Sequence, residues 1–217
     1  IFVTEKAGKV KIIKNGAVLS TPFLQLSVDQ LNERGLSSVA IDPNFNTNHY
    51  VYVYYTTSSS PIHNRLSRFT ANGDIAVNGS EQVLIDFEPS VGSIHNGGSI
   101  DFGPDGKLYI GVGNDNVNSN SQSLDTYKGK VLRMNPDGSV PSGNPFSGSA
   151  TKDRIWAYGF RNPWTVAIQP TTGKLFVNDV GEGSWEEINN ASVAGKNFGW
   201  PNAEGNSSNP LYTNPVF

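Results

Sequence analysis

A histidine at the entrance of a predicted strand is the first residue of the chain that could do chemistry. His95 is followed by Asn96 and two glycines, and the glycines add no side chain that would block the approach to the imidazole. An imidazole titrates at about pH 6.5, so it can accept a proton near neutrality. A histidine in this place can equally cap the turn before a strand, and the sequence by itself leaves both interpretations open.

A glycine-rich loop with several carboxylates is the second candidate. Residues 179–187 read Asp-Val-Gly-Glu-Gly-Ser-Trp-Glu-Glu. Ca²⁺ binds several hard oxygen donors, carbonyl or carboxylate, in a flexible shell, and such a loop suits it. The alternative is an acidic loop without a metal. Residues 114–125 also carry acids, but they lack the central Gly and the terminal Glu of an EF-hand, so we expect no EF-hand there.

The residues that follow His95 predict two strands joined by a tight turn. Ser99 to Phe102 alternates polar and apolar residues with a period of two, as a half-buried strand does. Pro104-Asp105-Gly106 has the residue types of a turn. Lys107 to Val112 is rich in β-branched and aromatic residues, which favour strands.

This pattern of strand, turn and strand occurs three times, with prolines at positions 43, 104 and 170, so the copies are almost evenly spaced. Two further strands follow each of the first two copies. Four antiparallel strands per repeat, with no helix longer than a turn or two, is typical of a β-propeller blade. A β-sandwich also has short strands but needs no such long, regular period, so we predict an all-β β-propeller. The expected strands are 2–4, 9–13, 17–24, 36–41, 50–56, 65–70, 82–87, 99–102, 107–112, 130–135, 154–158, 164–168 and 174–178, with weaker candidates near 187–188 and at Phe198.

The repeats give a partial unit at the start, two complete units, and a third unit that begins at Trp164. This amounts to roughly three to four blades. A propeller closes only when its last blade meets its first, because otherwise strand edges stay exposed. We therefore expect one β-propeller domain over residues 1–217 that is incomplete at both ends. A C-terminal segment beyond Phe217 or an additional chain would complete it.

The composition excludes several classes of protein. The net charge of −3 argues against a nucleic-acid surface, and no apolar run approaches the roughly 20 residues of a membrane span. The absence of Cys removes disulfides and thiolate metal sites. The start, from Ile1, is strand-like and does not look like a signal peptide. Low charge and many Asn, Ser, Thr and Gly residues favour a secreted or periplasmic bacterial protein.

Besides the repeats, the chain contains four distinctive segments, which are His95–Gly98, Lys130–Asn135, Trp156–Pro163 and Asn197–Pro201. Together these features resemble the glucose/sorbosone dehydrogenase family, and the resemblance extends from Phe2 to about Gly205. It implies a six-bladed propeller and an oxidoreductase that oxidises aldose sugars with pyrroloquinoline quinone and Ca²⁺. It also implies a small-molecule sugar substrate and an external electron acceptor.

The resemblance also implies roles for individual residues. His95 matches the catalytic base, which takes the hydroxyl proton while hydride leaves the anomeric carbon. Arg161 and Asn162 match the pair that contacts the quinone oxygens, where a guanidinium stabilises the charge that develops on reduction. The alternative for Arg161 is an arginine that ties two blades together through backbone carbonyls.

Further positions complete the set that the resemblance implies. Glu33 matches a polar contact to the cofactor, and its alternative is a solvated loop carboxylate. Gly181 and Glu182 match the positions whose main-chain carbonyls bind Ca²⁺. The cationic residues that hold the cofactor's carboxylates in the family lie beyond Phe217.

Two positions depart from the family pattern. Ile94 stands where the glucose-oxidising members usually have an acid, and Asn114 stands where they usually have an Asp near the catalytic histidine. An amide can hydrogen-bond an imidazole but cannot stabilise its cation with a charge. These departures keep a second function open, a propeller that has lost catalysis and binds a sugar or a protein.

Overall fold

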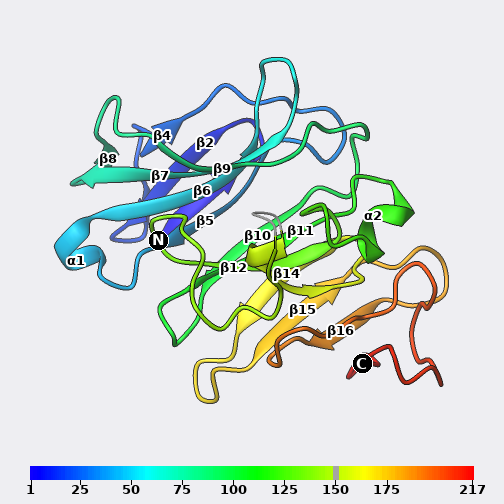
Figure 1. Ribbon diagram of the computed structural model, residues 1–217. Coiled ribbons are helices and arrows are strands. Elements are labelled where there is room, and N and C mark those ends of the chain that lie inside the picture. Colours follow the sequence, from blue (N-terminus) through cyan, green and yellow to red (C-terminus); the bar gives the residue numbers. More distant parts are fainter. Residues whose placement is uncertain (149–151) are drawn as a thin grey trace. The chain divides into compact units, whose positions relative to one another are not determined.

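The computed structural model describes residues 1–148 and 152–217, which contain sixteen strands, two short α-helices and one 3-10 turn (Figure 1). The longest of these helices has five residues, as the sequence predicts. No helix in the described residues is both long and apolar enough to cross a membrane. The chain divides into two compact units, residues 1–90 and 91–217, and each is described by itself.

The first unit contains two antiparallel sheets that share a core built around Val10, Phe23, Leu36 and Val53. The predicted strand 17–24 is wrong in its length, because it divides into two strands of two residues each. Pro22 lies between them and has no N–H for a sheet. The strands are β1 (Phe2–Glu5), β2 (Lys9–Lys14), β3 (Ala17–Val18) and β4 (Leu24–Gln25) in one sheet, and β5 (Leu36–Ile41), β6 (Tyr50–Thr56), β7 (Asn64–Asn72), β8 (Ile75–Ala76) and β9 (Gln82–Asp86) in the other, with α1 (Phe45–Asn48) between β5 and β6.

The second unit also contains two antiparallel sheets, in the orders β10-β11-β12-β13 and β14-β15-β16. The weak candidate at 187–188 lies in β16, whereas Phe198 is in no strand; its neighbour Asn197 forms an isolated bridge with Tyr158. The elements are β10 (Gly97–Phe102), β11 (Leu108–Val112), α2 (Asn118–Gln122), β12 (Lys130–Met134), η1 (Lys152–Arg154), β13 (Ile155–Tyr158), β14 (Pro163–Ile168), β15 (Leu175–Asp179) and β16 (Glu187–Asn190).

The register of the second unit brings several strand ends together. Gly97 at the start of β10 pairs with Val112 at the end of β11, and Val112 also pairs with Lys130 at the start of β12. In the neighbouring sheet, Pro163 at the start of β14 pairs with Asp179 at the end of β15. The loops that leave these positions therefore emerge at the same end of their sheets.

Side chains of β10 join the two sheets of the second unit. The Val166 N–H donates to Ser99 Oγ at 3.0 Å, and the Ile168 N–H donates to Asp101 Oδ2 at 3.1 Å. Because β14 is the first strand of its sheet, these side chains satisfy amides that would otherwise form an open edge. An apolar core packs beside this contact and includes Tyr109, Val131, Phe160, Val166, Leu175 and Val177.

The central strand β12 is buried on both faces, and this predicts a large cost for removing its side chains. Leu132 is 0% exposed, so Leu132→Ala should lower the free energy of unfolding by about 2–5 kcal/mol. Urea denaturation measures this quantity. Val193 is 61% exposed, and Val193→Ala should change it by less than about 0.5 kcal/mol. Equal effects of the two changes would contradict the assigned packing.

Candidate active site

His95 lies at the entrance of β10 in a left-handed backbone conformation, with φ 58°. Its side chain is buried, at 5% exposure, and its Nδ1 lies 2.9 Å from Asn114 Oδ1. Its carbonyl accepts a hydrogen bond from the Asp115 N–H at 3.1 Å. Asp115 and Asn116 have positive φ as well. Non-glycine residues in this conformation concentrate at functional sites, where the surrounding structure holds the strain.

The hydrogen bonds of Asn114 assign the tautomer of His95. Asn114 Oδ1 also accepts the Asn116 N–H at 3.0 Å, so this atom is the amide oxygen. Nδ1 of His95 must then carry the proton, and Nε2 of the neutral ring carries the lone pair. Asn114 Nδ2 lies 3.4 Å from both Asn118 Oδ1 and Ser121 Oγ. The amide that replaces the family's Asp therefore still orients the imidazole.

Asn114 also connects His95 to the connection between β13 and β14. Its backbone N–H donates to the Arg161 carbonyl at 2.9 Å, and the side chain of Asn114 is 0% exposed. Next to Arg161, the Asn162 Oδ1 accepts the Gly97 N–H at 3.0 Å. Gly97 itself has φ 59°, and a Cβ there would lie 2.7 Å from the Gly113 nitrogen. Hydrogen bonds thus connect the segment of His95 with the segment of Arg161 and Asn162.

Asp179, at the end of β15, holds the same connection from the other side. Its carboxylate accepts the Arg161 N–H at 2.9 Å and the Asn162 N–H at 2.6 Å. Burial raises the pKa of Asp179 to about 7, against these two hydrogen bonds and with a further contribution from the charge of Glu187. A carboxyl group buried at such a cost indicates that the position of the Arg161 backbone is tightly specified.

The Arg161 side chain makes the backbone-carbonyl contact that the sequence leaves open as one alternative, and it also contacts an aromatic ring. Its Nη1 donates to the Val180 carbonyl at 3.2 Å, which is the structural role that joins neighbouring segments. Its guanidinium carbon lies 5.5 Å from the centre of the Trp200 ring, a cation–π distance. Its Nε is buried and has no hydrogen-bond partner among the residues that the structure describes. A buried unpaired donor is costly, and it is suited to an acceptor supplied by a ligand.

The loop from Gly181 to Glu186 folds around a carboxylate from the C-terminal tail. The N–H groups of residues 182 to 185 all face Glu204 Oε1, and the Gly181 N–H donates to Glu186 Oε2 at 3.2 Å. Over the described residues, no group of three or more His, Cys, Asp or Glu side chains could hold a metal ion. Ligation at Gly181 and Glu182 would therefore depend on main-chain carbonyls, as the resemblance implies.

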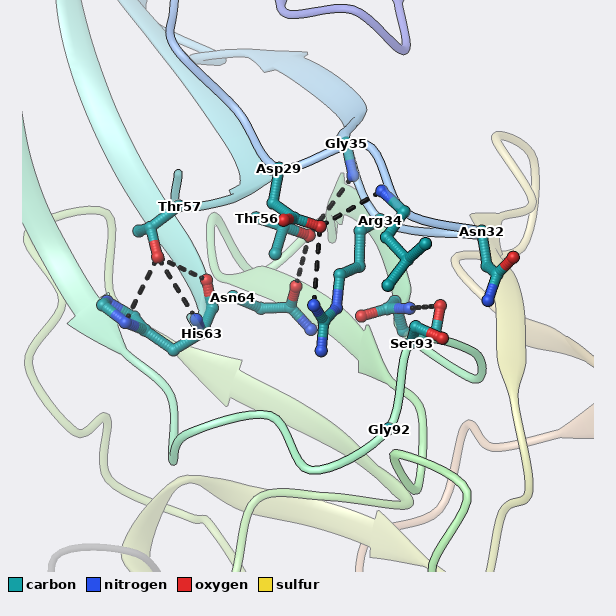
Figure 2. A network of polar contacts seen from close by, with 12 residues as sticks. Asp29, Asn32, Arg34, Gly35, Thr56, Thr57, His63, Asn64, Gly92 and Ser93 are labelled. Carbon is teal, nitrogen blue, oxygen red and sulfur yellow. Dashed lines mark hydrogen bonds and ion pairs between the residues drawn. The ribbon is translucent and has the colours of Figure 1, made fainter. Parts of the chain in front are cut away.

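Glu33 belongs to the first unit, so the structure does not relate it to His95. It is half-buried and directly precedes Arg34, whose Nη1 lies 3.5 Å from Asp29 Oδ1. Figure 2 shows this pair beside the hydrogen bond from Thr56 Oγ1 to Asn64 Oδ1, at 2.8 Å. The predicted contact of Glu33 to a cofactor stays a prediction.

The two other histidines, which the sequence predicts to be surface residues, the loop 114–125 and Ile94 have the following surroundings. His49 is exposed, whereas His63 lies 3.0 Å from Asp86 Oδ1 and contacts Thr57 (Figure 2). The 114–125 loop contains α2, and its Asp115 forms a buried ion pair with Lys128 at 2.7 Å. Ile94 is half-buried beside His95.

Sequence reasoning missed two of the residues that shape the site. It placed Asp179 in the metal loop and did not predict that it anchors Arg161 and Asn162. The pattern of residues predicts a loop-rich tail over residues 195–217 and gives Glu204 no role. A strand that ends on an Asp is a weak signal for the first residue. Nothing in the spacing points to the second, because it lies far beyond Glu186 in the sequence.

The model of the family "Glucose / Sorbosone dehydrogenase" matches residues 1–213. Quinoprotein glucose dehydrogenase B of Acinetobacter calcoaceticus is 31% identical over 94% of the chain and 48% of its own length. Human hedgehog-interacting protein is 29% identical over 82% of the chain and 29% of its own length. The chain spans about half the length of the bacterial relatives it matches.

The structure is similar to the PQQ-bound form of an aldose sugar dehydrogenase from Streptomyces coelicolor. The TM-score is 0.87 and the identity 33%, over the whole chain and 63% of that structure. The likeness confirms the predicted fold class, an all-β β-propeller.

The two hydrogen bonds to Asp179 predict that its loss destabilises the protein. Asp179→Ala leaves the Arg161 and Asn162 amides without their acceptor, so the free energy of unfolding should fall by about 1–3 kcal/mol for each unpaired donor. Urea denaturation at neutral pH measures the change. Asp125 is 79% exposed, and Asp125→Ala serves as the control with an effect below about 0.5 kcal/mol. An Asp179→Ala protein as stable as this control would refute the anchoring role.

Proposed function

Because the chain belongs to the glucose/sorbosone dehydrogenase family, we propose that the protein oxidises aldose sugars by hydride transfer to pyrroloquinoline quinone. The observation that carries the proposal is the hydrogen-bonded arrangement of the buried residues His95 and Asn114 with the backbone of Arg161. Asn114 fixes the tautomer of the imidazole and binds the Arg161 carbonyl, and the Arg161 guanidinium has a buried Nε without a partner among the described residues. This combination supplies a base and a positive charge, the two protein groups that the proposed hydride transfer to the quinone uses.

His95 acts as the general base in this proposal. The Asn114 oxygen holds the proton on Nδ1, so the lone pair of Nε2 accepts the proton of the sugar's anomeric hydroxyl group. Removing this proton favours loss of hydride from the same carbon. The imidazolium that forms is stabilised by an amide oxygen and not by a carboxylate, which makes Asn114 a weaker partner than the family's Asp.

Arg161 and Asn162 fit the cofactor by their chemistry. When bound, pyrroloquinoline quinone supplies an electrophilic quinone that accepts the hydride. Arg161 Nε is a buried donor that a quinone oxygen would satisfy, and the guanidinium charge favours the reduced state. The backbone of both residues is held by Asp179, so the guanidinium starts from a fixed position.

A calcium ion belongs to the proposal through Gly181 and Glu182. The carbonyl oxygens of these residues would be its protein ligands, and they are hard donors of the kind Ca²⁺ prefers. The support is the resemblance of the loop and the absence of competing thiol or imidazole ligands in its sequence. Glu33 is a proposed cofactor contact on the same basis.

The proposal extends to the rest of the molecule. We infer a six-bladed propeller, completed by a further segment or chain that supplies the cations for the cofactor's carboxylates. The partners are a sugar and an external electron acceptor. A secreted or periplasmic location is supported by the low charge and by the many Asn, Ser, Thr and Gly residues.

A second function is a propeller that binds a sugar or a protein without catalysis. Asn114 and Ile94, in place of acids, favour it. Reconstitution separates the two functions. The full-length native product is mixed with pyrroloquinoline quinone and Ca²⁺, and reduction of a dye is followed with a panel of aldoses. Sugar-dependent reduction supports the dehydrogenase, whereas neither turnover nor binding of the quinone would refute it.

Removal of the base should abolish most of the turnover. His95→Asn should lower kcat by about 10²–10⁴-fold, the range for loss of a general base. His49→Asn is a matched control, because His49 is exposed and has the same φ of 58°, which Asn tolerates. Steady-state kinetics of the reconstituted enzyme measure both. Unchanged turnover in His95→Asn would remove the base assignment.

Restoring a carboxylate beside His95 should increase turnover. A hydrogen bond to a charged group is stronger than a neutral one by about 1 kcal/mol, so Asn114→Asp should raise kcat by roughly five- to tenfold. Thermal unfolding is measured in parallel, because Asn114 is fully buried and a carboxylate there has a desolvation cost. A folded Asn114→Asp protein without a gain in turnover would contradict the role of this position.

A further inference from the structure

Glu204 forms an unusual set of hydrogen bonds with the Gly181–Glu186 loop. Its Oε1 accepts the N–H groups of Glu182, Gly183, Ser184 and Trp185, at 2.6, 3.1, 3.3 and 3.4 Å. Successive backbone N–H groups that face one point form a concave site for an anion. Here the anion is a carboxylate of the same chain, which reaches the loop from the segment after Trp200. The four hydrogen bonds outweigh the effect of burial and lower the pKa of Glu204.

Because the peptide group is planar, this contact also determines the direction in which the carbonyl groups of the loop point. In a trans peptide the N–H and the C=O of one unit point in opposite directions. The cis peptides in the described residues are at Ser60-Pro61 and Trp200-Pro201, so those of the loop are trans. The N–H groups of residues 182 to 185 face Glu204, and the carbonyls of residues 181 to 184 therefore point away from it.

Two of these carbonyls belong to Gly181 and Glu182, the positions proposed above as cation ligands. The loop is tightly folded at its first residue, because a Cβ on Gly181 would overlap the Trp185 oxygen and lie 2.7 Å from Glu204 Oε1. A Cβ on Gly183 would meet nothing within 4 Å. A Cβ added at Gly181 would therefore disturb the loop, whereas a Cβ added at Gly183 would leave it unchanged.

We propose that Glu204 is a positioning residue that fixes the conformation of the peptides whose Gly181 and Glu182 carbonyls would bind a divalent cation. The inference rests on the proposed function for the identity of the two ligands. Glu204 does not touch the ion in this arrangement; it binds the N–H side of the peptides whose C=O side binds the ion. The Gly205 N–H donates to Glu187 Oε1 at 2.5 Å and holds the segment in place.

Calcium titration of the full-length protein tests the inference, by isothermal calorimetry with Ca²⁺ alone after removal of metal with a chelator. Glu204→Ala should weaken Ca²⁺ binding at least tenfold. Glu204→Gln keeps one acceptor oxygen and should give an intermediate loss, so it preserves the test if Glu204→Ala does not fold. Gly181→Ala should also lose affinity, whereas Gly183→Ala should not. Glu5→Gln removes an exposed carboxylate of the first unit and controls for net charge.

Limited proteolysis without Ca²⁺ gives a second readout, because Glu204→Ala should increase cleavage within residues 181–186. Unchanged Ca²⁺ affinity in both Glu204 variants would overturn the inference but would not contradict the proposed oxidation of sugars. Failure of the native protein to bind Ca²⁺ would overturn it as well. Binding of Ca²⁺ that depends on Glu204, in a protein that oxidises no sugar, would support the inference and refute the proposed function.

Discussion

The buried amide of Asn114 is the contact on which the rest of the candidate site depends. Its backbone binds the Arg161 carbonyl and its side chain binds His95, so one residue fixes the distance between two groups that lie far apart in the sequence. A fully buried polar group is tolerated only when its hydrogen bonds are made. Any movement of the connection between β13 and β14 therefore also changes the position of the imidazole.

The need to hold separate loops in one arrangement by hydrogen bonds explains why the candidate site is polar although it is buried. Asp179 and Asp115 are both buried. Asp179 accepts the N–H groups of Arg161 and Asn162, which follow β13, and Asp115 accepts those of Val91 and Gly92, which precede β10. Such carboxylates contribute less to stability than apolar residues of the same volume would, but they specify one backbone path. The apolar core of the unit lies beside this cluster and supplies the burial that offsets its cost.

Much of the fold could be predicted because strand alternation and turn residues are local signals. The strands β5 and β6 have the predicted bounds, and the other long strands differ from them by only a residue or two at most of their ends. The two-residue strands β3, β4 and β8 are too short to show a period, and Pro22 separates the first two of them. His95, Arg161 and Asn162 could be predicted to lie together through the resemblance. Asp179 and Glu204 could not, because their partners are backbone N–H groups, which every residue except proline has.

The side-chain contacts between β10 and β14 have a consequence for how such a chain can be rearranged. Ser99 and Asp101 satisfy the amides of the next sheet, so the first strand of one sheet finishes the hydrogen bonding of its neighbour. A duplication or a circular permutation that moves the sheet of β14 must carry these acceptor residues with it. The part that such a rearrangement must keep intact is consequently a sheet together with the polar side chains on the first strand of the sheet before it.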